Sequence, residues 1–362
     1  MFVFLALSTQ ALYARAKNVI LFLGDAGGIP TLNLASIYQY EDPQKLFIQQ
    51  MPHIGLMDTS AADDWVTDSA AGMSAIVTGQ KTKNGVISQS SAAIRRKQDG
   101  EILETILEHA EQRGLSTGVV SNMDITDATP AACYAHANDR NASGIIFAQI
   151  FNPRFGDGVD VVIGAGRKSV LAAAAQIGLN VESLAREKRY AFYSSLQDMT
   201  ASDRRVIVLS GTGDFNPWEA TNRAIHALSQ NRKGYFLMVE WDMHTDHVKS
   251  GLDRAIAMDN TIRKTAQTVG KDTLILFAAD HSFDIRLQDG KRGVPLLSNT
   301  GAAGETRASA QIRVDDEHTG EQVLVTAQGP GAERVRGFIA NTDLFHIMMA
   351  AYGWERLGTN RK

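Results

Sequence analysis

The stretch Asn18-Val-Ile-Leu-Phe-Leu-Gly-Asp25 decides the fold, because it is a short apolar run that ends in a glycine and a carboxylate. Such a run predicts a strand that is buried on both faces of a sheet. Five more runs follow this pattern, at residues 114–121, 159–164, 205–210, 234–240 and 273–280. Helical periodicity separates them, most clearly at residues 101–113, 218–231 and 251–269. The sequence therefore predicts a doubly wound α/β fold, a mainly parallel sheet with helices on both faces.

Composition excludes several classes of protein. The chain has 362 residues, with 36 Lys and Arg against 40 Asp and Glu, so its formal net charge is -4. No basic run is longer than Arg95-Arg96-Lys97, and this argues against nucleic acid as a partner. Cys133 is the single cysteine, which rules out an intrachain disulfide.

The first residues resemble an export signal. A short apolar run is followed by Ala14-Arg15-Ala16, an A-x-A pattern that suits signal-peptide cleavage, although a basic start is missing. The alternative is a buried strand. We expect a signal peptide at residues 1–16, a single catalytic domain at residues 17–362 and a periplasmic or secreted protein. No later run reaches the ~18 apolar residues of a membrane span, so no membrane association is expected.

Acidic residues follow three of the predicted strands, at Asp25, Glu240 and Asp280-His281. The carboxyl ends of parallel strands meet at one edge of a sheet, where ligands of this fold class bind. Carboxylate and imidazole groups are ligands of catalytic zinc. Asp25 on its own is as readily explained as a helix cap, whereas the adjacent Asp280 and His281 point more strongly to a metal.

The triplet Thr67-Asp68-Ser69 begins a stretch of small residues that we expect to be helical. Backbone N–H groups at a helix N-terminus stabilise an anion, so this position suits a serine nucleophile or a bound phosphate. The simpler alternative is that Asp68 or Ser69 only caps the helix. Because no Gly-x-Ser-x-Gly elbow surrounds Ser69, a metal and not a histidine base is expected to activate it.

These motifs together resemble the alkaline phosphatases, a family of metal-dependent phosphomonoesterases. The resemblance runs in order from Asn18 to about Met349, and its motifs lie at residues 18–28, 66–79, 127–140 and 273–281 and at Glu317-His-Thr-Gly320. It implies two zinc ions, one magnesium ion, a phosphate-ester substrate and a homodimer. It also implies roles for single residues: Ser69 as the nucleophile, Arg140 as the phosphate-binding guanidinium, and Asp25, Thr129, Asp280, His281 and His318 as metal ligands. Within residues 127–140, Thr129 and Arg140 are expected to lie three helical turns apart on one helix face, and His136 is expected to be structural.

The chain departs from the family pattern at residues 236–247, which read Phe-Leu-Met-Val-Glu240-Trp-Asp242-Met-His244-Thr-Asp-His247. Alignment from the strand makes Glu240 a magnesium ligand and Asp242 a zinc ligand. Alignment back from the following helix makes Glu240 and His244 the zinc ligands, and their i, i+4 spacing would place them on one helical face. Glu240, Asp242 and His244 therefore all remain candidates, with Asp246 and His247 in reserve.

The expected function is hydrolysis of phosphate monoesters through a phosphoserine. The alternatives are a phosphodiesterase or sulfatase on the same fold, and a phosphate-binding or metal-binding protein without turnover. The Gly-rich and Ser-rich residues 290–311 are expected to form a long loop beside the site, ahead of an irregular stretch at residues 314–320.

Overall fold

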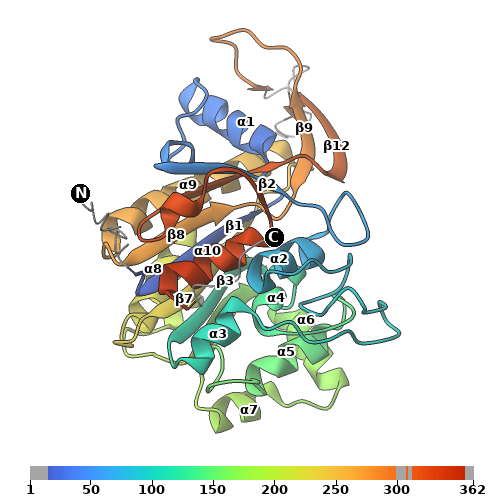
Figure 1. The fold of residues 1–362 in the computed structure, drawn as a ribbon, viewed down its shortest axis with the longest axis vertical. Coiled ribbons are helices and arrows are strands. Elements are labelled where there is room, and N and C mark those ends of the chain that lie inside the picture. The colour runs from blue at the N-terminus through green and yellow to red at the C-terminus, as the bar shows by residue number, and fades with distance from the viewer. Residues whose placement is uncertain (1–14, 299–306, 309–311, 355–362) are drawn as a thin grey trace, which may run out of the picture.

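The computed structural model describes residues 15–298, 307–308 and 312–354. Its centre is a sheet of ten strands in the order β14-β2-β13-β8-β1-β7-β3-β4-β6-β5 (Figure 1). The strands are β1 Asn18–Asp25, β2 His53–Asp58, β3 Ser116–Asp124, β4 Val161–Ala165, β5 Ala191–Tyr193, β6 Val206–Leu209, β7 Tyr235–Asp242, β8 Thr273–Ala278, β13 Val323–Gln328 and β14 Gly337–Ala340. Strand β13 is antiparallel to both of its neighbours, and every other pair in the sheet is parallel. All six predicted strands are present, and the predicted fold class is confirmed.

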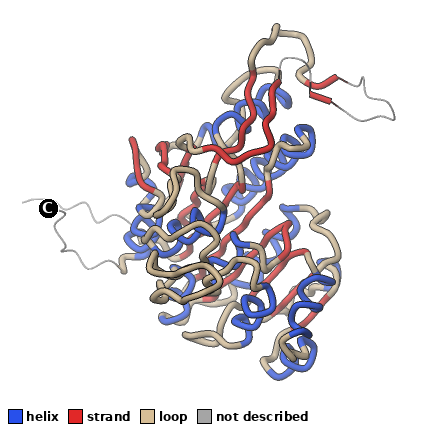
Figure 2. The backbone as a smooth tube through the Cα atoms, turned by 90° about the vertical axis from the view of Figure 1, so that its right-hand side faces the viewer, coloured by secondary structure: helices blue, strands red, loops and turns tan. Residues whose placement is uncertain are grey.

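Ten helices are described, and they flank the strands (Figure 2). They are α1 Ile29–Tyr40, α2 Ser69–Thr78, α3 Ile106–Gln112, α4 Ala128–Tyr134, α5 Ser143–Phe151, α6 Arg167–Gln176, α7 Val181–Glu187, α8 Pro217–Leu228, α9 Val248–Thr268 and α10 Asp343–Tyr352. The predicted helix at residues 101–113 begins only at Ile106. Thr105 and Glu108 form a capping box there, and this fixes where the helix starts.

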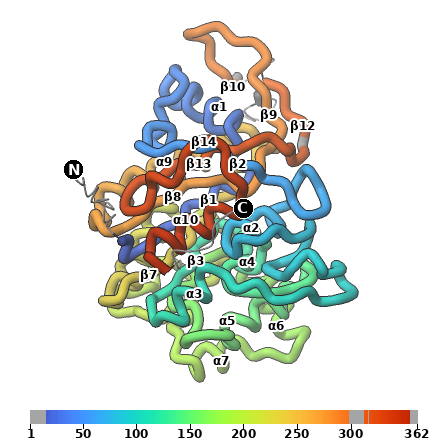
Figure 3. Tube along the Cα trace, viewed as in Figure 1, coloured from blue at the N-terminus to red at the C-terminus, as the bar shows by residue number. Residues whose placement is uncertain are grey.

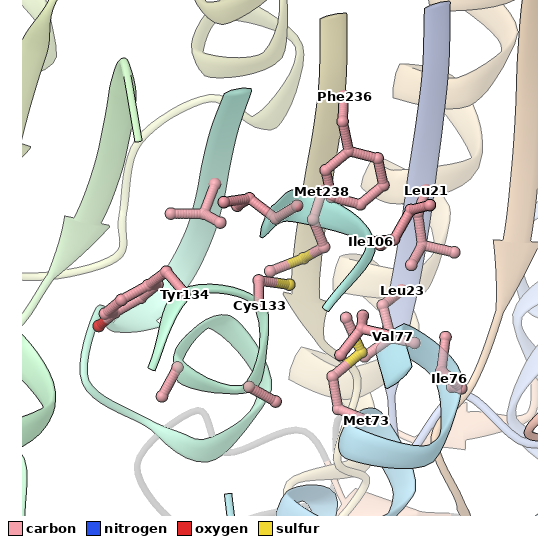
Figure 4. Close-up of a cluster of buried hydrophobic side chains, with 14 of the residues drawn as sticks. Leu21, Leu23, Met73, Ile76, Val77, Ile106, Cys133, Tyr134, Phe236 and Met238 are labelled. Carbon is pink, nitrogen blue, oxygen red and sulfur yellow. The ribbon is translucent and has the colours of Figure 1, made fainter. Parts of the chain in front are cut away.

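Side chains of β1 alternate between two cores, one on each face of the sheet. Leu21 and Leu23 pack with α2, α3, α4 and α10, whereas Ile20 and Phe22 pack with α1, α8 and α9. Figure 4 shows part of the first core, to which Met73 of α2, Cys133 of α4 and Met238 of β7 all contribute. Each fully buried Leu or Phe contributes about 1.5–3 kcal/mol, so these cores hold α2 and α4 firmly against the sheet.

Two smaller sheets stand beside the main one. Strand β9 (Ser282–Leu287) pairs antiparallel with β12 (Ile312–Thr319), and β10 (Leu297–Ser298) pairs with β11 (Arg307–Ala308). The expectation of an irregular stretch at residues 314–320 was wrong, because most of it belongs to β12. The irregularity is a register shift between Val314 and His318 in the pairing with β9. Figure 3 shows that the late strands β13 and β14 lie beside the early strand β2.

The ends of the chain lie largely outside the described residues. Of the expected signal peptide at residues 1–16, residues 1–14 are not described. Ala16 is buried and its backbone N–H donates to Ala351. Among the described helices, none is both long and apolar enough to cross a membrane.

Candidate active site

The predicted meeting of acidic strand ends is present in the structure. Asp25 at the end of β1 is in register with Asp242 at the end of β7, and Asp280 and His281 directly follow β8 on the other side of β1. Glu240 lies one pleat deeper in β7, in register with Ser121 of β3. Asp25, Glu240, Asp280 and His281 are each 2% exposed or less. The site is therefore a buried, strongly acidic cluster at one edge of the sheet.

The turn after β1 is made of small residues because the chain after β8 passes very close to it. A Cβ atom added to Gly28 would lie 2.0 Å from the Ser282 hydroxyl oxygen. The same turn places the backbone N–H of Ala26 3.4 Å from Asp280 Oδ1. A larger residue at Gly28 would push these strand ends apart.

Asp25, Asp280 and His281 form one group able to hold a metal ion, since they offer ligand atoms within 4.8 Å of one another. His281 Nε2 lies 3.1 Å from Asp25 Oδ1 and 3.6 Å from Asp280 Oδ2. Both of these carboxylate oxygens are buried without a hydrogen-bond partner. Buried anionic oxygens are costly unless a cation or a donor satisfies them, so the three residues fit a divalent metal ion.

His244, His281 and His318 form a second such group, again within 4.8 Å. The His281 and His318 rings are stacked, with centroids 3.7 Å apart. In each histidine Nδ1 faces an oxygen: Asp242 Oδ1 at 2.7 Å from His244, the Ser282 carbonyl at 3.1 Å from His281 and the Thr67 carbonyl at 3.1 Å from His318. An Nδ1–H that donates to an oxygen leaves the Nε2 lone pair free, which is the usual arrangement of metal-binding histidines.

The pKa values of the site residues also reflect the close approach of buried charged groups. Burial and the nearby charge of Asp25 raise the pKa of Asp280 to about 7. Burial opposes ionisation of His281, yet Asp280 and Asp25 raise its pKa to about 9. Burial and the positive His281 lower the pKa of His318 to about 4. Carboxylates and imidazoles this close together strongly affect one another's ionisation. A bound divalent cation would relieve the repulsion among the carboxylates.

Glu240 and Thr129 offer a third set of unsatisfied oxygens. Glu240 Oε2 accepts a hydrogen bond from the Ser121 hydroxyl, but Glu240 Oε1 has no partner, and neither does the fully buried Thr129 hydroxyl. Burial and the charges of Asp25 and Asp127 raise the pKa of Glu240 well above its usual range. A hydroxyl and a carboxylate are hard oxygen ligands, the kind that magnesium prefers.

Ser69 is the first residue of α2, and its hydroxyl oxygen lies 3.3 Å from His281 Nε2. Asp68 precedes it as the N-cap and accepts a hydrogen bond from the backbone N–H of Ala71. Capping by Asp68 leaves the Ser69 side chain free to face the metal-binding residues, at the positive end of the helix dipole.

Arg140 also faces Asp68, although by a different route from the predicted one. Helix α4 ends at Tyr134, so the expectation that Thr129 and Arg140 share a helix face was wrong. Ala137 instead forms a β-bridge with Ile87, and this pairing draws the chain away from helical geometry. Arg140 donates to Asp68 Oδ2 at 3.1 Å and to Asp127 Oδ1 at 3.0 Å, which fixes its guanidinium beside the start of α2.

The segment after Glu240 differs from the prediction as well. Glu240 lies within β7 and His244 follows the strand, so the expectation of one helical face for this pair was wrong. His244 nevertheless reaches the other two histidines. His247 and Asp246 point outward, with side chains 86% and 41% exposed.

Sequence reasoning missed the residues that hold the others in place, namely Ser121, Asp68 as a partner of Arg140, and Arg254, which donates to Asp242. These contacts join segments far apart in sequence, so no local pattern indicates them. His136 is structural as expected, because it is buried between Glu108 and the Ser88 carbonyl. The described part of residues 290–311 lines a cavity with Ile37 and Tyr38 of α1, while residues 299–306 and 309–311 lie outside the described residues.

Comparisons with known proteins relate the chain to the alkaline phosphatases. The family model for alkaline phosphatase matches residues 16–188 and 216–292. The chain is 28% identical to the alkaline phosphatase of Escherichia coli K12, across 93% of this chain and 86% of that protein. It is also 28% identical to streptomycin-6-phosphate phosphatase of Streptomyces griseus, across 94% and 91%. The solved alkaline phosphatase of the Antarctic bacterium TAB5 has a similar fold, with a TM-score of 0.77 at 24% identity across 95% of this chain and 100% of that one.

Proposed function

Because the chain belongs to the alkaline phosphatase family, we propose that it hydrolyses phosphate monoesters through a phosphoserine formed at Ser69. The observation that carries this proposal is the position of the Ser69 hydroxyl. It lies at the N-terminus of α2, 3.3 Å from a histidine that belongs to both groups of potential metal ligands. Two relatives that align along most of the chain are named as phosphatases, and the name of one specifies a phosphate ester.

We propose that Asp25, Asp280 and His281 hold one zinc ion and that His244 and His318 belong to the other. Glu240 and Thr129, with Asp25, are proposed to hold magnesium. When bound, these ions would lower the pKa of the serine hydroxyl and offset negative charge on the phosphoryl oxygens. Asp242 lies at this site too, in register with Asp25.

The protein's own residues then supply orientation and charge. The N-terminus of α2 presents Ser69 for in-line attack on phosphorus, and its dipole stabilises the anionic oxygen and the phosphoryl group. Arg140, fixed by Asp68 and Asp127, is placed to donate two parallel hydrogen bonds to phosphate oxygens. As the bond from the Ser69 oxygen to phosphorus forms, the ester P–O bond breaks and the alcohol leaves. Water then attacks the phosphoserine, which releases inorganic phosphate and restores the Ser69 hydroxyl, so one difficult displacement becomes two easier ones.

The test is hydrolysis of p-nitrophenyl phosphate by the zinc- and magnesium-loaded protein at mildly alkaline pH. Ser69→Ala should abolish turnover, and Ser183→Ala, in the first turn of the exposed helix α7, should not. Acid quenching during turnover followed by peptide mass spectrometry should find phosphate on Ser69. Faster hydrolysis of bis-p-nitrophenyl phosphate or of an aryl sulfate would instead establish a diesterase or a sulfatase. Phosphate binding without turnover would establish a binding protein.

We further propose that the enzyme is a homodimer in the periplasm or outside the cell. The family resemblance supports the first part and the export-like start supports the second. Size-exclusion chromatography with light scattering and fractionation of cells that express the full chain would test them.

A further inference from the structure

We propose that Asp242 is a positioning residue and not a metal ligand: Arg254 holds its carboxylate off the ion, and the carboxylate in turn orients His244. This inference rests on the proposed metal site, and it concerns which of the acidic residues at the sheet edge touch the metal.

Asp242 differs from the other carboxylates at this edge in how completely protein groups satisfy it. Its Oδ1 accepts hydrogen bonds from the His244 backbone N–H at 3.0 Å and from His244 Nδ1 at 2.7 Å, and its Oδ2 accepts one from Arg254. In contrast, Asp25 Oδ1, Asp280 Oδ2 and Glu240 Oε1 are buried and accept no hydrogen bond. The charged neighbour of the first two is His281 Nε2, at 3.1 Å and 3.6 Å, which is itself a potential metal ligand. The oxygens that remain available to a cation therefore belong to those three residues and not to Asp242.

The contact with Asp242 sets the direction in which His244 can bind. His244 Nδ1 lies 2.7 Å from Asp242 Oδ1 and 3.9 Å from Asp25 Oδ1, so we infer that Nδ1–H donates to the nearer carboxylate and that Nε2 is the nitrogen left for a metal. The His244 ring lies 5.7 Å from the His281 ring and 5.6 Å from the His318 ring, centroid to centroid. A carboxylate that holds one imidazole nitrogen while the other binds metal is a common outer contact of zinc sites.

A short connection between β7 and α9 brings Arg254 to this position. Helix α9 starts at Val248, only six residues after Asp242, and its first turn presses on that connection. A Cβ atom added to Gly251 would lie 2.4 Å from the His244 carbonyl oxygen, so the helix can approach this closely only with glycine there. Arg254, one turn further along α9, thereby reaches Asp242 while its side chain stays 40% exposed.

A guanidinium that is always charged competes with a metal ion for the same carboxylate oxygen. The ion pair therefore leaves the histidine nitrogens as the main protein ligands at this position. Nitrogen ligands without the carboxylate also carry less negative charge, so Arg254 lowers the attraction of the site for a divalent cation.

The experiment measures zinc affinity, by competition with a chromogenic chelator, and the visible absorption bands of the cobalt(II)-substituted protein, which report the ligand set. His244→Ala serves as the reference for loss of a direct ligand. Asp259→Asn is the matched control, because Asp259 pairs with Arg263 on the same helix α9 and accepts from the backbone of Ile48. It should leave both readouts unchanged.

Asp242→Asn keeps an oxygen that accepts from His244, so zinc affinity should fall only about 10- to 100-fold and the cobalt bands should keep their positions. Arg254→Gln frees the Asp242 carboxylate, so affinity should rise several-fold and the bands should shift. The double variant Asp242→Asn with Arg254→Gln should lose that gain.

An Asp242→Asn protein that matches His244→Ala in both affinity and band positions would overturn the assignment of Asp242. An Arg254→Gln protein with unchanged affinity and bands would overturn the role of Arg254. A wild-type protein that binds no zinc would overturn the proposed metal site itself. If zinc binds but Asp242→Asn changes the cobalt bands and Arg254→Gln does not, only the assignments of Asp242 and Arg254 would be overturned, and the metal site itself would stand.

Discussion

Replacing Glu111 with glutamine should stabilise the protein, and the gain should grow as pH rises. Glu111 of α3 is 5% exposed, and its carboxylate accepts from the Thr117 hydroxyl at 2.5 Å and from the Gly158 backbone N–H at 3.2 Å. Burial, with the charges of Asp160 and Asp157, raises its pKa from 4.5 to about 8. The folded protein thus keeps this proton over a pH range in which the unfolded chain has lost it.

Unfolding releases a proton in that range, so the free energy of unfolding falls as pH rises from about 4.5 to about 8. From pH 6 to pH 9 the loss due to Glu111 alone should be about 2.5 kcal/mol. Glutamine does not titrate, and it keeps one oxygen to accept from Gly158 and an amide to donate to the Thr117 hydroxyl. The stability difference between Glu111→Gln and wild type should therefore widen by about this amount between the two pH values.

Urea unfolding at pH 6, 7.5 and 9, followed by circular dichroism in the presence of a chelator, measures this difference. Comparison at each pH cancels the groups that titrate in both proteins. Glu101→Gln, at an exposed position, should show no pH-dependent difference from wild type. A Glu111→Gln protein whose stability difference stays constant from pH 6 to pH 9 would show that the buried carboxyl ionises normally, and the reasoning would fail.

Three further predictions concern the site. Arg140→Lys should raise KM for p-nitrophenyl phosphate about 10- to 100-fold, because an ammonium cannot contact both Asp68 and Asp127 while it binds two phosphate oxygens. Steady-state kinetics measures this change, and the control Arg95→Lys should leave KM unchanged. Gly28→Ala should cost about 1–3 kcal/mol in urea unfolding, since its Cβ would meet the Ser282 hydroxyl, while Gly211→Ala meets no atom within 4 Å and should be nearly neutral. Removal of metal by a chelator should lower the thermal midpoint in calorimetry, and re-addition of zinc should restore it; an unchanged midpoint would argue against a metal held by Asp25 and Asp280.

The sequence predicted the parallel half of the fold well because buried strands leave an unmistakable signal. In β1, residues facing both cores are apolar, so the run is continuous and its end at Asp25 is sharp. Four strands of the main sheet were not predicted, namely β2, β5, β13 and β14. Strand β2 has partly exposed positions such as Ile54, and its pairing with β13 joins residues more than 260 positions apart, which no local pattern reveals.

At the site, the sequence predicted the residues that carry charge better than the geometry that brings them together. Asp25, Asp280 and His281 were placed by the rule for parallel strand ends, and they lie together as that rule requires. The shared helix of Thr129 and Arg140 failed because the pairing of Ala137 with Ile87 overrides helix propensity. His318 was expected from a short motif, and a register shift in β12, invisible in sequence, lies just before it.

The neighbours of Glu240 and Asp242 help to distinguish the two possible alignments of residues 236–247. Both side chains leave the same face of β7, about 6.6 Å apart along the strand. Glu240 lies deeper, bonded to Ser121 and repelled by Asp25 and Asp127, whereas Asp242 lies at the rim beside His244 and Arg254. This arrangement supports the proposal that Glu240 and Thr129 hold the magnesium ion and that His244 belongs, with His318, to one of the zinc ions. A chain that shortens this connection thus keeps its deep carboxylate and changes the groups at the rim, Asp242, His244 and Arg254.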